Sequence, residues 1–319
     1  MSGGIPAGRD EGESAAERLI AGVTRSLMRM TLRPVVRPGV PVALRRRRMA
    51  RVSGLSPAPR GAEYRAASCG GVRGQSVTAR RAPSAGRAVL YLHGGFYSLG
   101  SPATHRVITG HLARRCAARV FAADYRLAPE HPFPAALDDA VAAYGGLLSG
   151  GLGPGEIAIA GDSAGGGLAV ATAVRLRDLG VPLPAALVLF SPWVDLGLGA
   201  LGAPPRGEIM VSLGMLSECA RFYLAGHPAD DPLASPVGAN LEGLPPTLIQ
   251  VGTDELLLTD SRRLHAALVA AGVEAELHEY PRRWHVFQMN AGLLADADHA
   301  LDEAGAFVRT HAPAVAITR

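Results

Sequence analysis

Short apolar runs that alternate with longer helical stretches constrain the fold of this chain more than any other feature. Strands that alternate with helices are typical of a parallel sheet covered on both faces. The sequence therefore predicts an α/β fold. The expected strands are 89–92, 120–123, 157–160, 187–190, 247–251 and 275–280. The expected helices are about 104–117, 135–149, a stretch after Gly161 that ends near Leu179, and 261–272.

The N-terminal part of the chain, residues 1–60, does not follow this alternation. Residues 1–13 are Gly-rich and polar, and we expect them to be disordered. Apolar residues recur at helical spacing over 14–31, and a second short helix is predicted at 42–52, after three helix-breaking prolines. These residues are expected to form helices of a cap.

A second interruption lies at about 195–240, where Gly and Pro surround one short predicted helix near Ser212–Leu224. We expect this insertion to pack with the N-terminal helices and complete the cap. The rest of the stretch 61–319 is expected to form one main domain, because it is long enough to bury a large core.

The strongest local motif is Gly161-Asp162-Ser163-Ala164-Gly165, a G-x-S-x-G between an expected strand and an expected helix. That context is typical of a nucleophile elbow, in which a serine projects from a tight turn. Glycine at the two outer positions removes side chains that would collide with the turn. The helix that follows directs its N-terminus at the serine and favours developing negative charge. Ser163 is therefore the predicted nucleophile.

A serine hydroxyl needs a base, and the base needs an orienting carboxylate. In this kind of fold both follow the serine in the chain, each on a loop after a later strand. Asp254 follows the expected strand 247–251, and His285 follows 275–280. We predict Asp254 and His285 as the partners, with the neighbouring Glu255 as the alternative carboxylate. Asp260 fits better as the N-cap of the helix that follows.

Backbone amides must also stabilise the negative charge that develops on a carbonyl oxygen. The loop His93-Gly94-Gly95-Phe96 follows an expected strand upstream of the serine, where such an oxyanion hole belongs. We place the hole at Gly94, Gly95, Phe96 and Ala164, with the amides of the last three as donors. His93 is expected to hold the loop. The candidate substrate-binding residues are Tyr97, Trp193, Phe222 and Tyr223.

Composition narrows the class of partner. The net charge is +4 and all 32 basic residues are arginine, with the densest cluster at 45–48. We interpret that cluster as a solvated helix face and expect no nucleic-acid partner, because no aromatic or RNA-binding motif accompanies it. Three widely spaced cysteines, no secretory leader and no apolar stretch of spanning length predict a reduced, cytoplasmic protein without membrane insertion. No metal or other cofactor is expected.

These motifs together resemble the hormone-sensitive-lipase-like family of carboxylesterases, particularly its bacterial members. The match covers about 85–310. It is carried by 91–95 with 100–102, by 124–135, and by Ser191-Pro192-Trp193, 231–236 and 243–247. The family's third oxyanion-loop glycine is Phe96 here. Its amide can still donate, but its ring is expected to crowd the pocket and narrow the substrate range.

The resemblance implies an α/β-hydrolase fold with a mostly parallel eight-stranded sheet and a helical cap. It also implies metal-free hydrolysis of short- to medium-chain acyl esters through an acyl-enzyme. One alternative is an acetyl hydrolase or amidase that deacylates a secondary metabolite. A second, from a different class, is a non-catalytic small-molecule binding protein, as in the plant gibberellin receptor. A third is a membrane-surface lipase. Some members form homodimers, but no residue pattern here requires one.

Overall fold

The computed structural model describes residues 14–54, 58–80 and 86–313. The expectation of disorder over 1–13 lies outside these residues. Within them, no helix is long and apolar enough to cross a membrane.

One eight-stranded sheet forms the centre of the molecule, in the order β1-β2-β4-β3-β5-β6-β7-β8. Neighbouring strands are parallel from β4 through β8, whereas β1 pairs with β2 and β2 with β4 in antiparallel fashion. The strands are β1 (Ala62–Cys69), β2 (Val72–Ala79), β3 (Ala88–Leu92), β4 (Arg119–Ala123), β5 (Ile157–Asp162), β6 (Ala186–Phe190), β7 (Thr247–Gly252) and β8 (Ala275–Tyr280). The expected α/β-hydrolase architecture is therefore confirmed.

The six apolar runs predicted as strands are β3 to β8, each within two residues of its expected bounds. The hairpin of β1 and β2 has no counterpart among those runs. Its side chains are mostly polar or small and only partly buried, so its hydrophobic pattern is weak.

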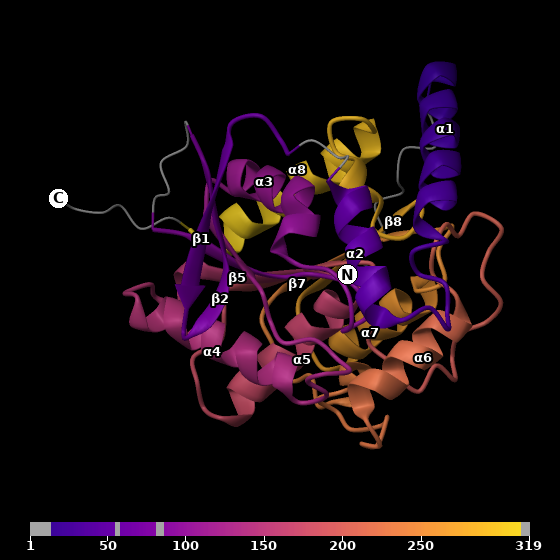
Figure 1. The fold of residues 1–319 in the computed structure, drawn as a ribbon. Coiled ribbons are helices and arrows are strands. Elements are labelled where there is room, and N and C mark those ends of the chain that lie inside the picture. The colour runs from indigo at the N-terminus through magenta and orange to yellow at the C-terminus, as the bar shows by residue number, and fades with distance from the viewer. Residues whose placement is uncertain (1–13, 55–57, 81–85, 314–319) are drawn as a thin grey trace.

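Helices cover both faces of the sheet (Figure 1): α3 (Arg106–Arg115) and α8 (Ala295–His311) on one face, and α4 (Ala135–Ser149), α5 (Ala164–Asp178) and α7 (Leu258–Ala270) on the other. Successive side chains of a strand point to opposite faces. Accordingly Val89 and Tyr91 pack in the cluster with α3 and α8, whereas Leu90 and Leu92 pack in the cluster with α4, α5 and α7. Burial on both faces explains the continuous apolar runs.

The predicted helix 261–272 starts three residues earlier, at Leu258, so the expectation that Asp260 is its N-cap is wrong. Asp260 lies in the first turn of α7, fully buried, and accepts hydrogen bonds from the amides of Val194 and Asp195. The amides of Val194 and Asp195 need an acceptor because buried N–H groups are rarely left unpaired, and the Asp260 carboxylate provides it. Helix α8 was not among the predicted elements.

Three helices lie beyond the carboxyl ends of the strands: α1 (Ala15–Leu32), α2 (Val42–Ser53) and α6 (Leu213–Leu224). Ser14 begins α1 with a capping box that pairs it with Glu17. Arg45 of α2 is fully buried and pairs with Glu218 of α6, so the interpretation of the arginine cluster as a solvated face is wrong for this residue. The contact joins the N-terminal helices to the insertion.

Candidate active site

Ser163 occupies a strained turn between β5 and α5, with a φ of 53° and a ψ of −121°. Its amide donates to the Phe190 carbonyl at 2.8 Å. A Cβ atom on Gly161 would lie 2.3 Å from the Gly165 carbonyl oxygen, and one on Gly165 would lie 2.0 Å from the Leu92 carbonyl oxygen. Both glycines of the motif are therefore required by space, and the turn is a nucleophile elbow in geometry as well as in sequence.

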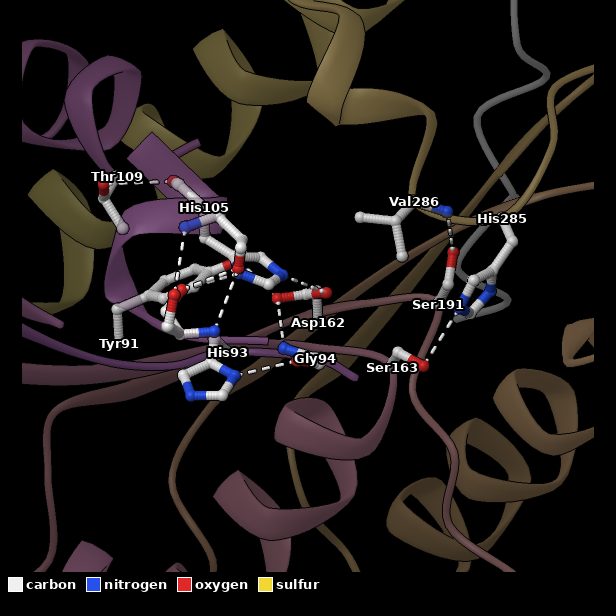
Figure 2. Close-up of polar contacts among 12 residues, drawn as sticks. Tyr91, His93, Gly94, His105, Thr109, Asp162, Ser163, Ser191, His285 and Val286 are labelled. Atoms are coloured by element: carbon white, nitrogen blue, oxygen red, sulfur yellow. Dashed lines mark hydrogen bonds and ion pairs between the residues drawn. The ribbon is translucent and has the colours of Figure 1, made fainter. Parts of the chain in front are cut away.

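His285 lies beside this serine. Its Nε2 is 2.9 Å from Ser163 Oγ (Figure 2). Its Nδ1 is 3.0 Å from Glu255 Oε1. The three side chains come from loops that follow β5, β7 and β8. All three residues are buried. The structure thus assembles a hydroxyl, an imidazole and a carboxylate in hydrogen-bonding order.

The carboxylate of Glu255 is held by further donors. Its Oε2 accepts from Ser191 Oγ at 2.7 Å and from the Gly252 amide at 2.9 Å. The buried Glu208 supports the same loop, since its Oε2 accepts from the Leu256 amide at 3.0 Å. Glu255 is therefore fixed by contacts that leave Oε1 for His285.

The prediction that Asp254 faces His285 is wrong, and the neighbouring Glu255 takes that position. Asp254 points to the surface and pairs with Arg25 of α1 at 2.9 Å, with about a quarter of each side chain exposed. Its carboxylate packs against Gly207: a Cβ atom added to that glycine would lie only 2.3 Å from Asp254 Oδ2. Adjacent residues in the turn after β7 point in different directions. The longer side chain of Glu255 reaches His285 from the second of these positions.

Electrostatics at His285 favour its positive form. Burial alone would lower the pKa of His285, but the facing carboxylate of Glu255, with Glu208 and Asp162 farther away, raises that pKa above its ordinary value. An imidazole that gains a proton more readily is a stronger base toward the hydroxyl of Ser163.

The loop after β3 carries the expected oxyanion amides, with one exception. The amides of Gly95, Phe96 and Ala164 donate to no acceptor within the described residues. The amide of Gly94, by contrast, donates to Asp162 Oδ1 at 2.9 Å. Gly94 therefore belongs to the loop, but its N–H is not available to an oxyanion. Three free donors remain.

Phe96 holds a φ of 58°, in the left-handed region that favours glycine. The conformation costs on the order of 1 kcal/mol for a residue with a side chain. The ring is buried against the core while also lining the cavity described below. Its expected effect on substrate range remains a prediction.

His93 supports the loop and is not a base for the serine. Its ring stacks on Tyr125 at a centroid distance of 4.3 Å and on His105 at 5.4 Å. Burial, with the nearby His105, lowers the pKa of His93 to about 3, so the ring is neutral. Nδ1 lies 2.8 Å from the Gly94 carbonyl oxygen, which fits a donated hydrogen bond.

A cavity of about 900 Å³ opens onto Ser163 and His285. Helix α1 forms much of its wall through Leu19, Ile20, Val23 and Leu27. Four methionines also line it: Met28, Met49, Met210 and Met289. Methionine side chains adapt to irregular apolar shapes, so the wall suits a bulky apolar group.

None of the four predicted substrate-binding residues lines this cavity. Tyr97, Trp193 and Tyr223 are at most 2% exposed, and Tyr97 stacks on Tyr223 at 3.9 Å. Phe222 packs at the edge of the same core cluster. The prediction for these residues is therefore wrong, because aromatic side chains close to the motifs in sequence pack in the core instead. The residues of α1 that line the cavity were predicted only as a helical stripe.

Sequence reasoning also missed the cluster around Asp162, the second residue of the elbow motif, and His105. The two lie 3.4 Å apart beside the oxyanion loop. Asp162 was in the motif throughout, but the pattern assigns no role to that position. Among the described residues, no group of three or more side chains has an arrangement that would hold a metal ion.

Comparison with known proteins gives a consistent result. A model of the α/β-hydrolase fold family matches residues 89–289. An acetyl-hydrolase of Streptomyces hygroscopicus is 48% identical over 233 residues, 72% of this chain and 78% of that protein. An esterase of Acinetobacter venetianus is 38% identical over 240 residues, 74% of this chain and 78% of that protein.

Solved structures agree over nearly the whole length. An esterase from the bacterial hormone-sensitive lipase family has a TM-score of 0.84 at 39% identity, covering 94% of this chain and 99% of that one. A hormone-sensitive lipase from a metagenome library has a TM-score of 0.85 at 38% identity, covering 91% and 99%.

Proposed function

The chain belongs to the α/β-hydrolase fold family, and on that premise we propose that it is a serine carboxylesterase acting through Ser163, His285 and Glu255. The resemblance to the hormone-sensitive-lipase-like family is confirmed by the solved relatives. The observation that carries the proposal is the unbroken hydrogen-bonded sequence from Ser163 to Glu255 beside three unpaired amides.

In the first half of the reaction, Ser163 Oγ attacks the ester carbonyl while His285 Nε2 takes its proton. Glu255 holds the ring and stabilises the imidazolium that forms. The amides of Gly95, Phe96 and Ala164 bind the oxyanion of the tetrahedral intermediate. His285 then protonates the alkoxide as the alcohol leaves, and the acyl group stays on Ser163.

In the second half, a water molecule takes the place of the alcohol. His285 accepts its proton as the oxygen attacks the acyl-enzyme, and the same amides bind the second oxyanion. Collapse of this intermediate breaks the bond to Ser163, which regains its proton from His285. The carboxylic acid leaves, and no cofactor is required.

A p-nitrophenyl ester series from acetate to palmitate tests the proposal, with wild type and Ser163→Ala measured in parallel. We expect turnover by the wild type and its loss in the variant, because no other group would attack the carbonyl. Retained turnover in a folded Ser163→Ala protein would contradict the proposed role of the serine.

A second candidate is removal of an acetyl group from an oxygen or nitrogen of a larger apolar molecule. The 48% identity to a protein named acetyl-hydrolase favours it, and so does the size of the cavity. Paired acetyl ester and acetyl amide substrates with the same bulky partner separate the two activities. Faster cleavage of these compounds than of simple esters would favour the second candidate.

We propose a cap built from residues 1–60 and the insertion at 195–240, on a catalytic domain 61–319. The buried contact of Arg45 with Glu218 supports this division. We also propose a cytoplasmic enzyme with a small-molecule ester substrate and no nucleic-acid partner. Its three free cysteines, Cys69, Cys116 and Cys219, support the location. Light scattering of the purified protein tests whether it forms a homodimer.

A further inference from the structure

Asp162 is a buried carboxylate next to the nucleophile, and the proposed reaction does not use it. It is 3% exposed. Oδ1 accepts from Tyr91 Oη at 2.6 Å and from the Gly94 amide at 2.9 Å. Oδ2 lies 3.4 Å from His105 Nε2. Figure 2 shows this cluster on the side of Ser163 opposite His285.

The contact with Gly94 is too close to be incidental. A Cβ atom on Gly94 would lie 2.2 Å from Asp162 Oδ2, so only glycine lets the carboxylate lie against this backbone. The bond therefore joins the end of β5, which carries Ser163, directly to the loop after β3. The next two residues of that loop, Gly95 and Phe96, provide the free amides. Both have positive φ, which does not persist without support from the surroundings.

His105 is placed to balance the charge of Asp162. Its Nδ1 lies 3.2 Å from the Ser101 carbonyl oxygen, and its Nε2 faces the Asp162 carboxylate. Thr104 Oγ1 lies closer to Nδ1, at 2.9 Å, and because it donates its own proton to the Ser101 carbonyl at 2.8 Å it acts toward Nδ1 as an acceptor. Both nitrogens of His105 thus face acceptors, and an imidazole donates from both nitrogens only when it is protonated. Although burial alone would lower the pKa of His105, Asp162 raises it above the ordinary value. The two residues thus form a buried ion pair.

We infer that Asp162 and His105 are positioning residues that hold the Gly95 and Phe96 amides at the oxyanion. The inference rests on the proposed function. Asp162 ties the loop to the elbow through Gly94, and His105 balances the charge of Asp162, which is 3% exposed. Both residues line the cavity, but their polar atoms are engaged in the contacts described above. Their loss should weaken stabilisation of the transition state and leave ground-state binding unchanged.

The test compares Asp162→Asn and His105→Gln with wild type on a p-nitrophenyl ester that the wild type cleaves. Removing one oxyanion donor costs roughly 100- to 1000-fold in kcat, and a loosened donor should cost less. We expect kcat to fall about 10- to 100-fold in Asp162→Asn, with KM within about twofold. An unchanged kcat, or a change in KM alone, would overturn the inference.

Asp260→Asn is the matched control, since it removes another buried carboxylate that accepts two backbone amides away from the oxyanion loop. It should leave kcat unaltered. Where Asp162→Asn does not fold, Tyr91→Phe removes only the hydroxyl donor to Asp162. One hydrogen bond of about 1 kcal/mol then predicts a fall of about fivefold in kcat with KM unchanged.

A trifluoromethyl ketone provides a readout that ester turnover does not. It adds to the serine as a hemiketal whose oxyanion needs the same amides. Its affinity should weaken in Asp162→Asn by the same factor as kcat/KM. Equal affinity for wild type and variant would contradict the inference while leaving the esterase proposal intact. A wild type that neither cleaves esters nor binds the ketone through Ser163 would contradict both.

Discussion

Four residues with positive φ lie at the proposed catalytic centre or next to it in the chain. Phe96, Ser163, Ser191 and Val286 all have φ between 49° and 58°. Each such conformation costs on the order of 1 to 3 kcal/mol and persists only where neighbouring contacts impose it. Here the strained conformations direct side chains and amides toward Ser163 and His285. The geometry of the site is therefore kept at a cost in conformational free energy. We therefore expect a single substitution at one of these positions to change kcat strongly, and a substitution at a neighbouring position to change it little.

Replacing each of two adjacent carboxylates tests which one serves His285. We expect Glu255→Gln to lower kcat by about 1000-fold or more, because the imidazolium loses its facing charge and its orientation. Asp254→Asn should leave kcat within about twofold, since that side chain pairs with Arg25 at the surface. Steady-state kinetics on one p-nitrophenyl ester decide the matter. The reverse ranking would show that Asp254 orients the base.

The pH profile of kcat/KM reports the protonation of His285 in the free enzyme. The base must be neutral, so activity is lost as pH falls through its pKa, which the structure raises above the usual 6.5. Residual activity in Glu255→Gln should fail at a lower pH than in wild type, because the carboxylate that raises the pKa is gone. An acid limb at the same pH in both proteins would contradict this prediction.

Among the elements, α1 is attached to the rest of the molecule by few contacts. Only Ala21, Thr24 and Leu32 of this helix are buried, while Leu19 and Val23 are more than 60% exposed at the cavity wall. Arg25 provides a fixed point. It pairs with Asp254, donates to the Arg282 carbonyl and lies 5.2 Å from the Trp284 ring. The carboxylate expected to orient the base thus anchors a helix that lines the cavity.

Removing this anchor should affect binding more than chemistry. For Arg25→Ala we expect a stability loss of about 1 kcal/mol, as for a partly exposed ion pair with a cation–π contact. KM for longer acyl esters should rise severalfold with kcat nearly constant, since α1 lines the cavity. Thermal melting and the p-nitrophenyl series measure both. Arg29→Ala is the control, because Arg29 is on the exposed side of α1. An equal rise in KM in Arg29→Ala would contradict the role of Arg25 as the anchor of this helix.

At the scale of the whole molecule, different parts of the sheet contribute to stability and to the proposed reaction. The apolar side chains of β3 to β8 contribute to the cores on both faces, and the site lies at the carboxyl ends of these strands. Such a division is general for open α/β sheets. Substitutions at the other end of a strand should therefore change folding and spare turnover.

Leu187, fully buried at the start of β6, is a suitable test. Leu187→Ala should cost about 2 to 5 kcal/mol, from lost burial and the cavity left behind. Leu179→Ala, whose side chain is 53% exposed, should cost about 0.5 kcal/mol or less. Urea unfolding gives both values. Below its melting temperature, Leu187→Ala should retain the kcat of wild type, and a large loss there would argue that the core and the site are coupled.

The sequence alone determined those features that a short stretch of residues specifies. Continuous apolar runs identified six strands, because burial on both faces requires them. Gly161 and Gly165 identified the elbow, because no side chain fits there. The loop order predicted Ser163 and His285 as partners, and their side chains lie 2.9 Å apart. The polar hairpin and α8 escaped, since neither has a pattern strong enough to separate it from its surroundings.

The tertiary structure alone decided between groups that are equivalent in sequence. Glu255 faces His285 and Asp254 faces Arg25, although they are neighbours in one turn. Phe96 and Tyr97 are neighbours as well, yet only Phe96 lines the cavity. Asp162 and His105 meet only because β3, β5 and the segment before α3 converge. The direction of a side chain in a turn depends on which distant atoms occupy the space around it, and no local pattern carries that information.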